Sequence, residues 1–316
     1  MPEKPYEPLL HRELHAHDAR QHFARQLSLV HDVVNYGTNL IPSCLASSKR
    51  DLGDVIVITV LLKQVVMMLD AFEMLIAEAC AEASILQARA VFEASLYLDW
   101  MVSSDKEKKA LYYYVANLRK ERQWTRRGVS DDPEQKTFFA NLGDFAEAME
   151  PTRRKLTDMA PEQLRKIEQF LAKEPYAQVD AEFEKAKGGR QYDAAWHAPL
   201  GESSVRGIAK ALGRLHEYEV FYVQMSEMTH ASRYESHIKI QKGGINLEPI
   251  RHLEGLATTL RFTLSIALYT YRKVLEHYRP GQLAEFSGRY VRDWREAFMN
   301  MPVIQYEKGS SGATLI

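Results

Sequence analysis

Apolar residues recur at steps of three and four along most of the chain, which is the spacing of amphipathic helices. The predicted helices cover about 17–46, 54–79, 85–102, 104–124, 203–212, 215–232, 247–278 and 283–298. The segment 54–79 is apolar around most of its circumference, so we expect it near the centre of the molecule. No alternating pattern exceeds four residues, and 236–240 is the only weak strand candidate. The sequence therefore predicts an all-α, multi-helix bundle.

The middle third has a different pattern. Residues 128–201 contain several short helical segments, many charges and few large apolar side chains. We interpret this part as a charged, short-helix insertion, which either caps the bundle as a solvated layer or acts as a lid or partner-binding arm. The predicted organisation is one helical domain over 1–316, with a lead-in (1–16), core helices (17–127 and 202–300), the insertion and a tail (301–316).

Composition narrows the class of protein. Gly (16) and Pro (12) are few for 316 residues, and they fall mostly at predicted helix ends. The formal net charge of −1 argues against a protein that coats nucleic acid or an anionic membrane. Cys44 and Cys80 lie in apolar stretches and form no CxxC motif, which is typical of buried thiols in a protein of a reducing compartment. The apolar run 55–69 is too short to span a bilayer, so we expect a cytoplasmic, bacterial-type protein without a membrane partner.

One polar stripe lies on the third predicted helix. Arg89 and Glu93 are four residues apart and therefore share a helix face, and Tyr97 and Trp100 extend it. The surrounding residues are mostly apolar, so this pair must be ion-paired or hydrogen-bonded. It is either an internal ion pair that fixes the helix register or a guanidinium pre-organised in a pocket.

A second polar stripe begins at Tyr222 and continues through Ser226, His230, Arg233 and His237 at helical steps. If the helix continues that far, these side chains share one face. The stripe is either a polar seam at a helix end or part of a site. It also contains a Glu-x-x-His sequence, which is half of a di-iron signature, but the second half is missing. We therefore predict no metal and no cofactor.

Other motifs give no firm assignment. The histidines near the N-terminus (His11, His15, His17 and His22) are interpreted as an exposed polar face before a helix. Signatures of dinucleotide-binding, P-loop, zinc-protease and serine-hydrolase sites are missing from the sequence. Arg followed four to six residues later by His, the pattern of the helical HEPN ribonucleases, recurs only about as often as chance allows, so it stays a distant analogy.

Three segments together resemble a bacterial group of helical proteins known only as a domain of unknown function. They are Arg89–Tyr97, then Trp196-His197 followed by Ser204–Gly213, and finally Tyr218–Ser232. The resemblance covers about residues 55–235. It implies an all-α bundle in which the Arg/Glu helix and the Ser-x-x-x-His helix contribute polar residues, and it implies no established activity.

Two hypotheses about function follow. In the first, an internal polar pocket binds a small anionic ligand, nucleotide or RNA, and the reaction considered is phosphodiester cleavage by a defence or toxin-type protein. In the second, the protein is a non-enzymatic interaction module, the polar residues form a structural network, and a homodimer is one form it could take. The predicted catalytic residues are Arg89, Glu93, Ser226 and His230, and the predicted ligand-binding residues are Tyr97, Tyr222, Arg233 and Trp196.

Overall fold

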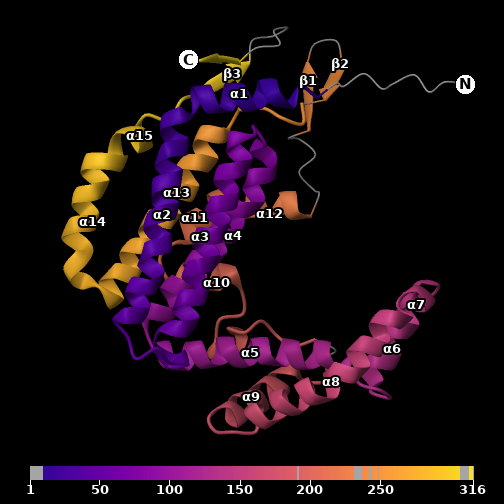
Figure 1. Cartoon of the computed structure of the whole chain (residues 1–316). Coiled ribbons are helices and arrows are strands. Elements are labelled where there is room, and N and C mark those ends of the chain that lie inside the picture. Colours follow the sequence, from indigo (N-terminus) through magenta and orange to yellow (C-terminus); the bar gives the residue numbers. More distant parts are fainter. Residues whose placement is uncertain are drawn as a thin grey trace, which may run out of the picture. The chain divides into compact units, whose positions relative to one another are not determined.

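The computed structural model describes residues 10–190, 192–230, 237–241, 244–247, 249–306 and 313–315 (Figure 1). The chain forms two compact units. The first, here called the bundle unit, comprises 1–51, 58–104 and 205–316, and the second, here called the charged unit, comprises 52–57 and 105–204. Both are built from helices, so the predicted all-α class is confirmed.

Four long helices run along the bundle unit (Figure 1): α2 (Ala24–Ala46), α3 (Val57–Ala77), α4 (Ala81–Ser103) and α13 (Leu256–Tyr278). A shorter helix, α1 (Arg12–His22), precedes them. The side chains buried between the long helices are mainly Leu, Val, Ile and Phe, and α13 packs against both α4 and α2. Burial of this apolar surface stabilises the unit.

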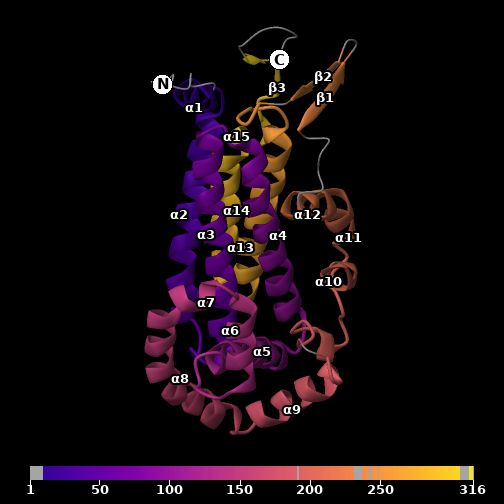
Figure 2. The same ribbon diagram turned by 90° about the vertical axis from the view of Figure 1, so that its right-hand side faces the viewer.

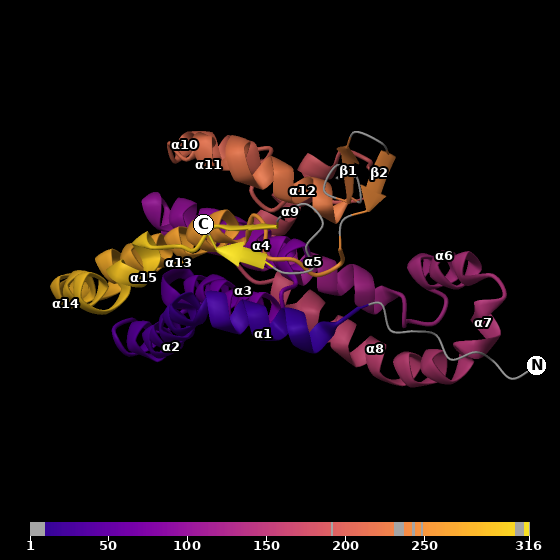
Figure 3. The ribbon, with the colours of Figure 1, turned by 90° about the horizontal axis from the view of Figure 1, so that it is seen from above.

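A row of short helices lies along one side of α4 (Figures 2 and 3). It consists of α10 (Val205–Ala211), α11 (Leu215–Glu217), a π-helical turn (Tyr218–Tyr222) and α12 (Val223–Thr229). Seen from above, this row forms one layer, α4 and α13 form the next, and α2 and α3 lie on the other side (Figure 3). Two-stranded antiparallel hairpins pair β1 (Ile238–Gln241) with β2 (Gly244–Leu247) and β3 (Ile304–Tyr306) with β4 (Ala313–Leu315).

The C-terminal helices are tied to α2 by one carboxylate. They are α14 (Leu283–Arg289), a π-helical turn (Tyr290–Trp294) and α15 (Arg295–Met299). The Trp294 indole N–H donates to Asp32 at 2.8 Å, and Arg289 donates to the same carboxylate at 3.1 Å. Burial alone would raise the pKa of Asp32, but these two donors outweigh it and hold the pKa below its usual range.

The charged unit consists of α5 (Lys106–Arg126), α6 (Pro133–Leu142), α7 (Phe145–Ala148), α8 (Glu150–Leu171) and α9 (Tyr176–Lys187), with single helical turns at Leu52–Ile56 and Ala198–Leu200. Helix α5 packs against α8 and α9. The sequence pattern predicts α5 as one of the core helices of residues 17–127, whereas in the structure it is the central helix of the charged unit. Its arginine-rich face explains this placement, because that face meets the carboxylates of α9.

Several helix ends differ from the prediction. The predicted helix 17–46 is divided at Phe23. The dipeptide Ala160-Pro161 favours a helix start, because proline suits a first helical position, but α8 continues through Pro161. Helix α5 begins at Lys106, directly after Asp105, which adopts a left-handed conformation and makes no side-chain cap. Asp132 does cap α6 as its sequence suggests, since its carboxylate accepts the Glu134 N–H at 2.8 Å.

One stretch among the described residues, Leu52–Ala77, is long and apolar enough to span a bilayer. This stretch is longer than the apolar run 55–69 seen in the sequence, because it also includes the start of the helical turn before α3 and the last part of α3. Half of its most apolar window is buried within the protein. A core helix of a soluble protein passes the same test, so length and composition alone assign no membrane.

Candidate functional site

Four of the predicted site residues meet in one cluster of the bundle unit. The Arg89 guanidinium on α4 donates to the Tyr222 hydroxyl at 2.8 Å and lies 3.5 Å from the Glu93 carboxylate. The Tyr222 hydroxyl in turn donates to the Glu93 Oε2 atom at 3.0 Å, and the Tyr97 hydroxyl donates to the Glu93 Oε1 atom at 3.3 Å. The guanidinium also lies 4.9 Å from the centre of the Tyr222 ring. The cluster therefore joins α4 to the π-helical turn before α12.

The protonation of Tyr222 limits what this cluster can do. Burial, reinforced by the Glu93 charge, raises the pKa of Tyr222 to about 12, so its hydroxyl is a neutral donor at pH 7. Both Glu93 oxygens accept hydrogen bonds, and Arg89 is paired with Glu93. The charges of Arg89 and Glu93 are thus paired with each other, although the buried Arg89 Nε atom makes no hydrogen bond in the described part of the chain. This pairing is the arrangement of a structural clamp between two elements.

The remaining predicted residues do not join this cluster. Ser226 is partly buried on α12, and His230 is exposed at the turn that ends that helix. Along a helix, the rise from Tyr222 to His230 is about 12 Å, and no described hydrogen bond or ion pair joins His230 to Arg89. Helix α12 ends at Thr229 and His237 precedes β1, so the condition for one continuous stripe, a helix that reaches His237, is not met. Arg233 lies outside the described residues.

Trp196 belongs to the charged unit rather than to the bundle unit. It is buried there, and its ring meets the Tyr113 ring edge-on with centroids 5.3 Å apart. Within that unit it is a core residue.

A second polar network lies deeper in the bundle unit, around Arg214. Its guanidinium donates to Glu217 at 2.7 Å and to Ser95 at 3.2 Å, and it lies 3.5 Å from the Asp99 carboxylate. Tyr269 donates to the same Asp99 oxygen at 2.8 Å. Arg214 and Asp99 are only 4 % and 5 % exposed, so this is a buried ion pair whose partners are all hydrogen-bonded.

Sequence reasoning missed this network, although a signal was present. Ser95 and Asp99 are four residues apart inside an otherwise apolar run of α4, on a different face from Arg89 and Glu93. Two polar residues at that spacing in a buried helix need partners. Arg214 follows Gly213, whose positive φ of 71° ends α10, and its position against α4 depends on that turn.

A cavity of about 530 Å³ lies beside the Arg214 network, within the bundle unit. Its apolar wall includes Phe221 and Phe262, whose rings stack with centroids 4.0 Å apart. Glu217 and Tyr269 belong to both the cavity and the network. A cavity of this size and mixed lining is typical of small-molecule sites.

Two charged side chains that line this cavity, Glu217 and Arg261, differ in whether they form an ion pair. The Glu217 carboxylate is held by Arg214. The Arg261 guanidinium, which lines the cavity from α13, donates to the Met299 carbonyl at 3.3 Å, and it forms no ion pair with a carboxylate in the described part of the chain. Burial and the hydrogen bond to Asp99 raise the pKa of Tyr269. The cavity therefore offers one unpaired cation, a neutral phenol and an aromatic wall.

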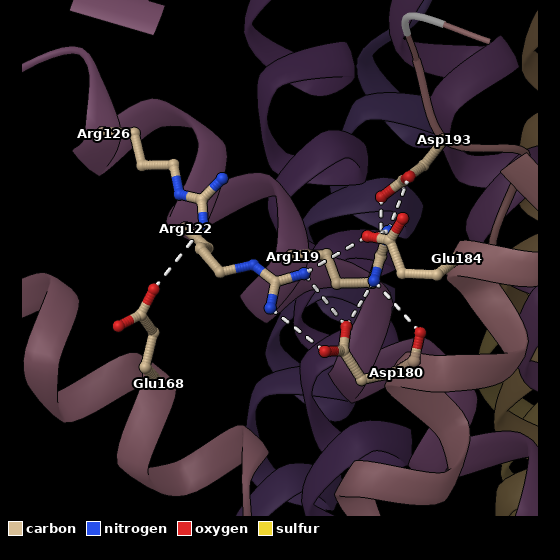
Figure 4. Close-up of polar contacts among 7 residues, drawn as sticks. All are labelled: Arg119, Arg122, Arg126, Glu168, Asp180, Glu184 and Asp193. Atoms are coloured by element: carbon tan, nitrogen blue, oxygen red, sulfur yellow. Dashed lines mark hydrogen bonds and ion pairs between the residues drawn. The ribbon is translucent and has the colours of Figure 1, made fainter. Parts of the chain in front are cut away.

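The charged unit holds a different polar cluster (Figure 4). Arg119 on α5 is 2 % exposed at its side chain and is bonded by three carboxylates: Asp180, Glu184 and Asp193. Arg122 donates to Asp180 as well, and Arg126 pairs with Glu168 at 3.6 Å. Since carboxylates match the arginines, this cluster lacks the excess positive charge of an anion site.

Metal binding has no candidate among the residues that the structure describes, because no group of three His, Cys, Asp or Glu side chains comes together there. The N-terminal histidines do not form such a group either, among the residues that the structure describes. His11 precedes α1, whereas His15, His17 and His22 lie within it, and His11 and His17 are exposed.

Comparison with known proteins supports the resemblance noted in the sequence. The model of a family of unknown function, DUF5677, matches residues 55–245, which is more than half of the chain. No curated protein and no solved structure matches the chain. The match spans the Arg89 cluster, the helices α5 to α9 of the charged unit, and Arg214 with its partners Ser95, Asp99 and Glu217, whereas Tyr269 lies beyond it. By this match the chain belongs to the DUF5677 family.

Proposed function

We propose that the bundle unit binds a small organic anion with an apolar body, in the cavity lined by Phe221, Arg261, Phe262 and Tyr269. The observation that carries this proposal is the pairing of an aromatic wall with an arginine that has no carboxylate partner in the described part of the chain. An apolar ligand body would displace water from the wall, and its anionic group would pair with Arg261.

The buried network supports the same proposal. Arg214 holds Glu217, and Asp99 holds Tyr269, so two side chains of the cavity wall are fixed by partners behind them. A site whose lining is fixed before the ligand arrives loses less conformational entropy on binding. In this proposal Arg214 and Asp99 position the lining, whereas Arg261 contacts the ligand.

The test uses 8-anilinonaphthalene-1-sulfonate, an aromatic anion whose fluorescence reports binding. We expect saturable binding to the full chain, and Arg261→Gln should weaken it about tenfold, as for loss of a charge-assisted hydrogen bond. Ser265→Trp should abolish binding, because Ser265 lines the cavity and is exposed, so a large side chain can fill the space. The matched control is Arg272→Gln, an exposed arginine on the same helix that does not line the cavity.

Binding that is unchanged in both Arg261→Gln and Ser265→Trp would contradict the proposal. A nucleotide can be compared with the aromatic sulfonate in the same assay, because the predicted ligand class included nucleotides and RNA. Stronger competition by a nucleoside monophosphate than by an aromatic carboxylate would assign the ligand to that class.

Phosphodiester cleavage by Arg89 and His230 has less support. Arg89 is already paired with Glu93 and Tyr222, so a substrate phosphate would have to compete with Glu93 for it. The exposed His230 is the feature that favours the idea. RNA cleavage by the wild-type chain that is lost in both His230→Ala and Arg89→Gln would favour it, whereas equal activity in His230→Ala would remove His230 from catalysis.

A further inference from the structure

An apolar stripe is exposed on α3, away from the proposed ligand cavity. Val60 is 50 % exposed, Met67 46 % and Met74 64 %. They are spaced by seven residues, and the partly exposed Gln64 and Ala71 lie between them. The resulting steps of four, three, four and three are those of the a and d positions of a coiled coil.

The helix was expected at the centre of the molecule, because it is apolar around most of its circumference. In the structure only part of it faces the core, where Leu62, Val65 and Leu69 are buried. The stripe Val60–Met74 is therefore apolar surface beyond what the core of the unit uses. It extends for about 21 Å along the helix.

Two charged residues on one edge of the stripe indicate its partner. Lys63 and Asp70 are both exposed, and neither forms an ion pair in the described part of the chain. If Gln64 and Ala71 are a positions and Met67 a d position, then Lys63 and Asp70 are both g positions. In an antiparallel pair of helices, g positions of one helix lie beside g positions of the other.

The stripe is nearly symmetric about Met67. When two copies of α3 pair antiparallel with Met67 opposite Met67, Val60 lies opposite Met74, and Gln64 of one copy lies within one residue of the position opposite Ala71 of the other. The same register brings Lys63 of each copy beside Asp70 of the other, twice by symmetry. A two-fold axis requires this self-complementarity of a single patch. A parallel pair would leave both charges without opposite partners.

We infer that α3 is a homodimer interface, in which two copies of this chain pair antiparallel through Val60, Gln64, Met67, Ala71 and Met74. This inference is independent of the ligand cavity. The dimer is isologous and closed, so it predicts two copies and no larger assembly.

The first experiment measures the mass of the full chain by sedimentation at about 1–100 μM, a range suited to a small interface. We expect a dimer. Met67→Glu places two like charges on the symmetry axis and should shift the protein to monomer, with the dissociation constant raised at least tenfold. The control is Met159→Glu, a 59 % exposed methionine of α8 outside the stripe, which should stay dimeric.

The second experiment tests the orientation. Lys63→Glu should weaken the dimer about three- to tenfold, as should Asp70→Lys, and the double variant should restore it. Met67→Cys should form an intermolecular disulfide under oxidation, whereas Val60→Cys should not, because the two copies of residue 60 lie about 21 Å apart along the pair.

The following results would overturn the inference: a monomer at 100 μM, a dimer that Met67→Glu leaves intact, or ready crosslinking of Val60→Cys. Helix α3 is also apolar enough to meet a membrane, so co-sedimentation with phosphatidylglycerol-containing vesicles is measured in parallel. Vesicle binding that Met67→Glu abolishes, with a monomer in solution, would assign the stripe to a lipid surface instead.

Discussion

In the bundle unit most buried side chains are apolar, and the few buried charges stand in pairs such as Arg214 with Asp99. In the charged unit a single buried arginine, Arg119, is surrounded by three carboxylates from outside its own helix. The cavity of the bundle unit is lined by Arg261, which has no carboxylate partner in the described part of the chain. In the charged unit, Arg119 instead holds helices together. Arginines in a cluster therefore do not identify an anion site unless their charge is in excess.

The largest effect should come from Arg119→Met. This variant leaves Asp180, Glu184 and Asp193 close together without their shared cation, so we expect the free energy of unfolding of the charged unit to fall by about 3–5 kcal/mol. Hydrogen exchange of α5 and α9 would measure it. The control is Arg154→Met, whose exposed guanidinium pairs only within α8 and which should change protection little. Unchanged exchange in Arg119→Met would show that the network is not what holds this unit.

Gly37→Ala should have the next largest effect, and it acts on the bundle unit. A Cβ at position 37 would lie 2.1 Å from the Tyr271 hydroxyl oxygen, a clash between α2 and α13. We expect a loss of about 1–3 kcal/mol in the free energy of unfolding, measured by urea denaturation. Gly288→Ala is the matched control, because its Cβ would meet nothing within 4 Å. Equal stability of Gly37→Ala and wild type would refute close packing at this point.

Two neighbouring tyrosines of α13 should respond differently to loss of the hydroxyl. Tyr269→Phe removes the donor to the buried Asp99 and should cost about 1–2 kcal/mol. Tyr271→Phe removes a buried hydroxyl that has no hydrogen-bond partner in the described part of the chain, so it should be neutral or slightly stabilising. Thermal unfolding of both variants tests the difference, and a larger loss in Tyr271→Phe would contradict it.

The smallest effect should be seen in acid. Hydrogen bonds from Arg119 hold the pKa of Asp193 below its usual range despite partial burial. Its stabilising contribution is therefore complete above its ordinary pKa of about 4 and is lost as the pH falls toward the lowered folded value. Protection against exchange in the charged unit, corrected for the intrinsic pH dependence of amide exchange, should fall as the pH drops below about 4. This acid dependence should shrink in Asp193→Asn. An identical pH profile in that variant would contradict the assignment.

Sequence patterns predicted the helices and the contact between Arg89 and Glu93, because both depend on spacing within one helix. The spacing of Ser95 and Asp99 indicates two buried polar residues that need partners, but it could not identify Arg214, since Arg214 and Asp99 are 115 residues apart and meet only through packing. The end of α12 at Thr229 was missed for a related reason. Helical spacing of polar residues continues through His237, although 236–240 is also a weak strand candidate, and in the structure His237 directly precedes β1.

The ligand cavity was likewise outside the reach of the sequence. Its wall combines Phe221, from the π-helical turn, with Phe262, from α13, and these positions carry no shared motif. Arg261 looks like an ordinary surface arginine in the sequence, and its significance comes from the cavity beside it. The apolar character of α3, in contrast, was visible in the sequence, but which of its faces is exposed was not.

The most direct test of the account is hydrogen exchange of the full chain with and without saturating 8-anilinonaphthalene-1-sulfonate. The account predicts that protection increases around 216–221, 257–269 and 301–303, which contain the residues that line the cavity of the bundle unit, and that the charged unit is unchanged. Protection confined to the charged unit, around Arg119 and Asp193, would contradict it, because the anion would then bind the arginine cluster instead of the cavity.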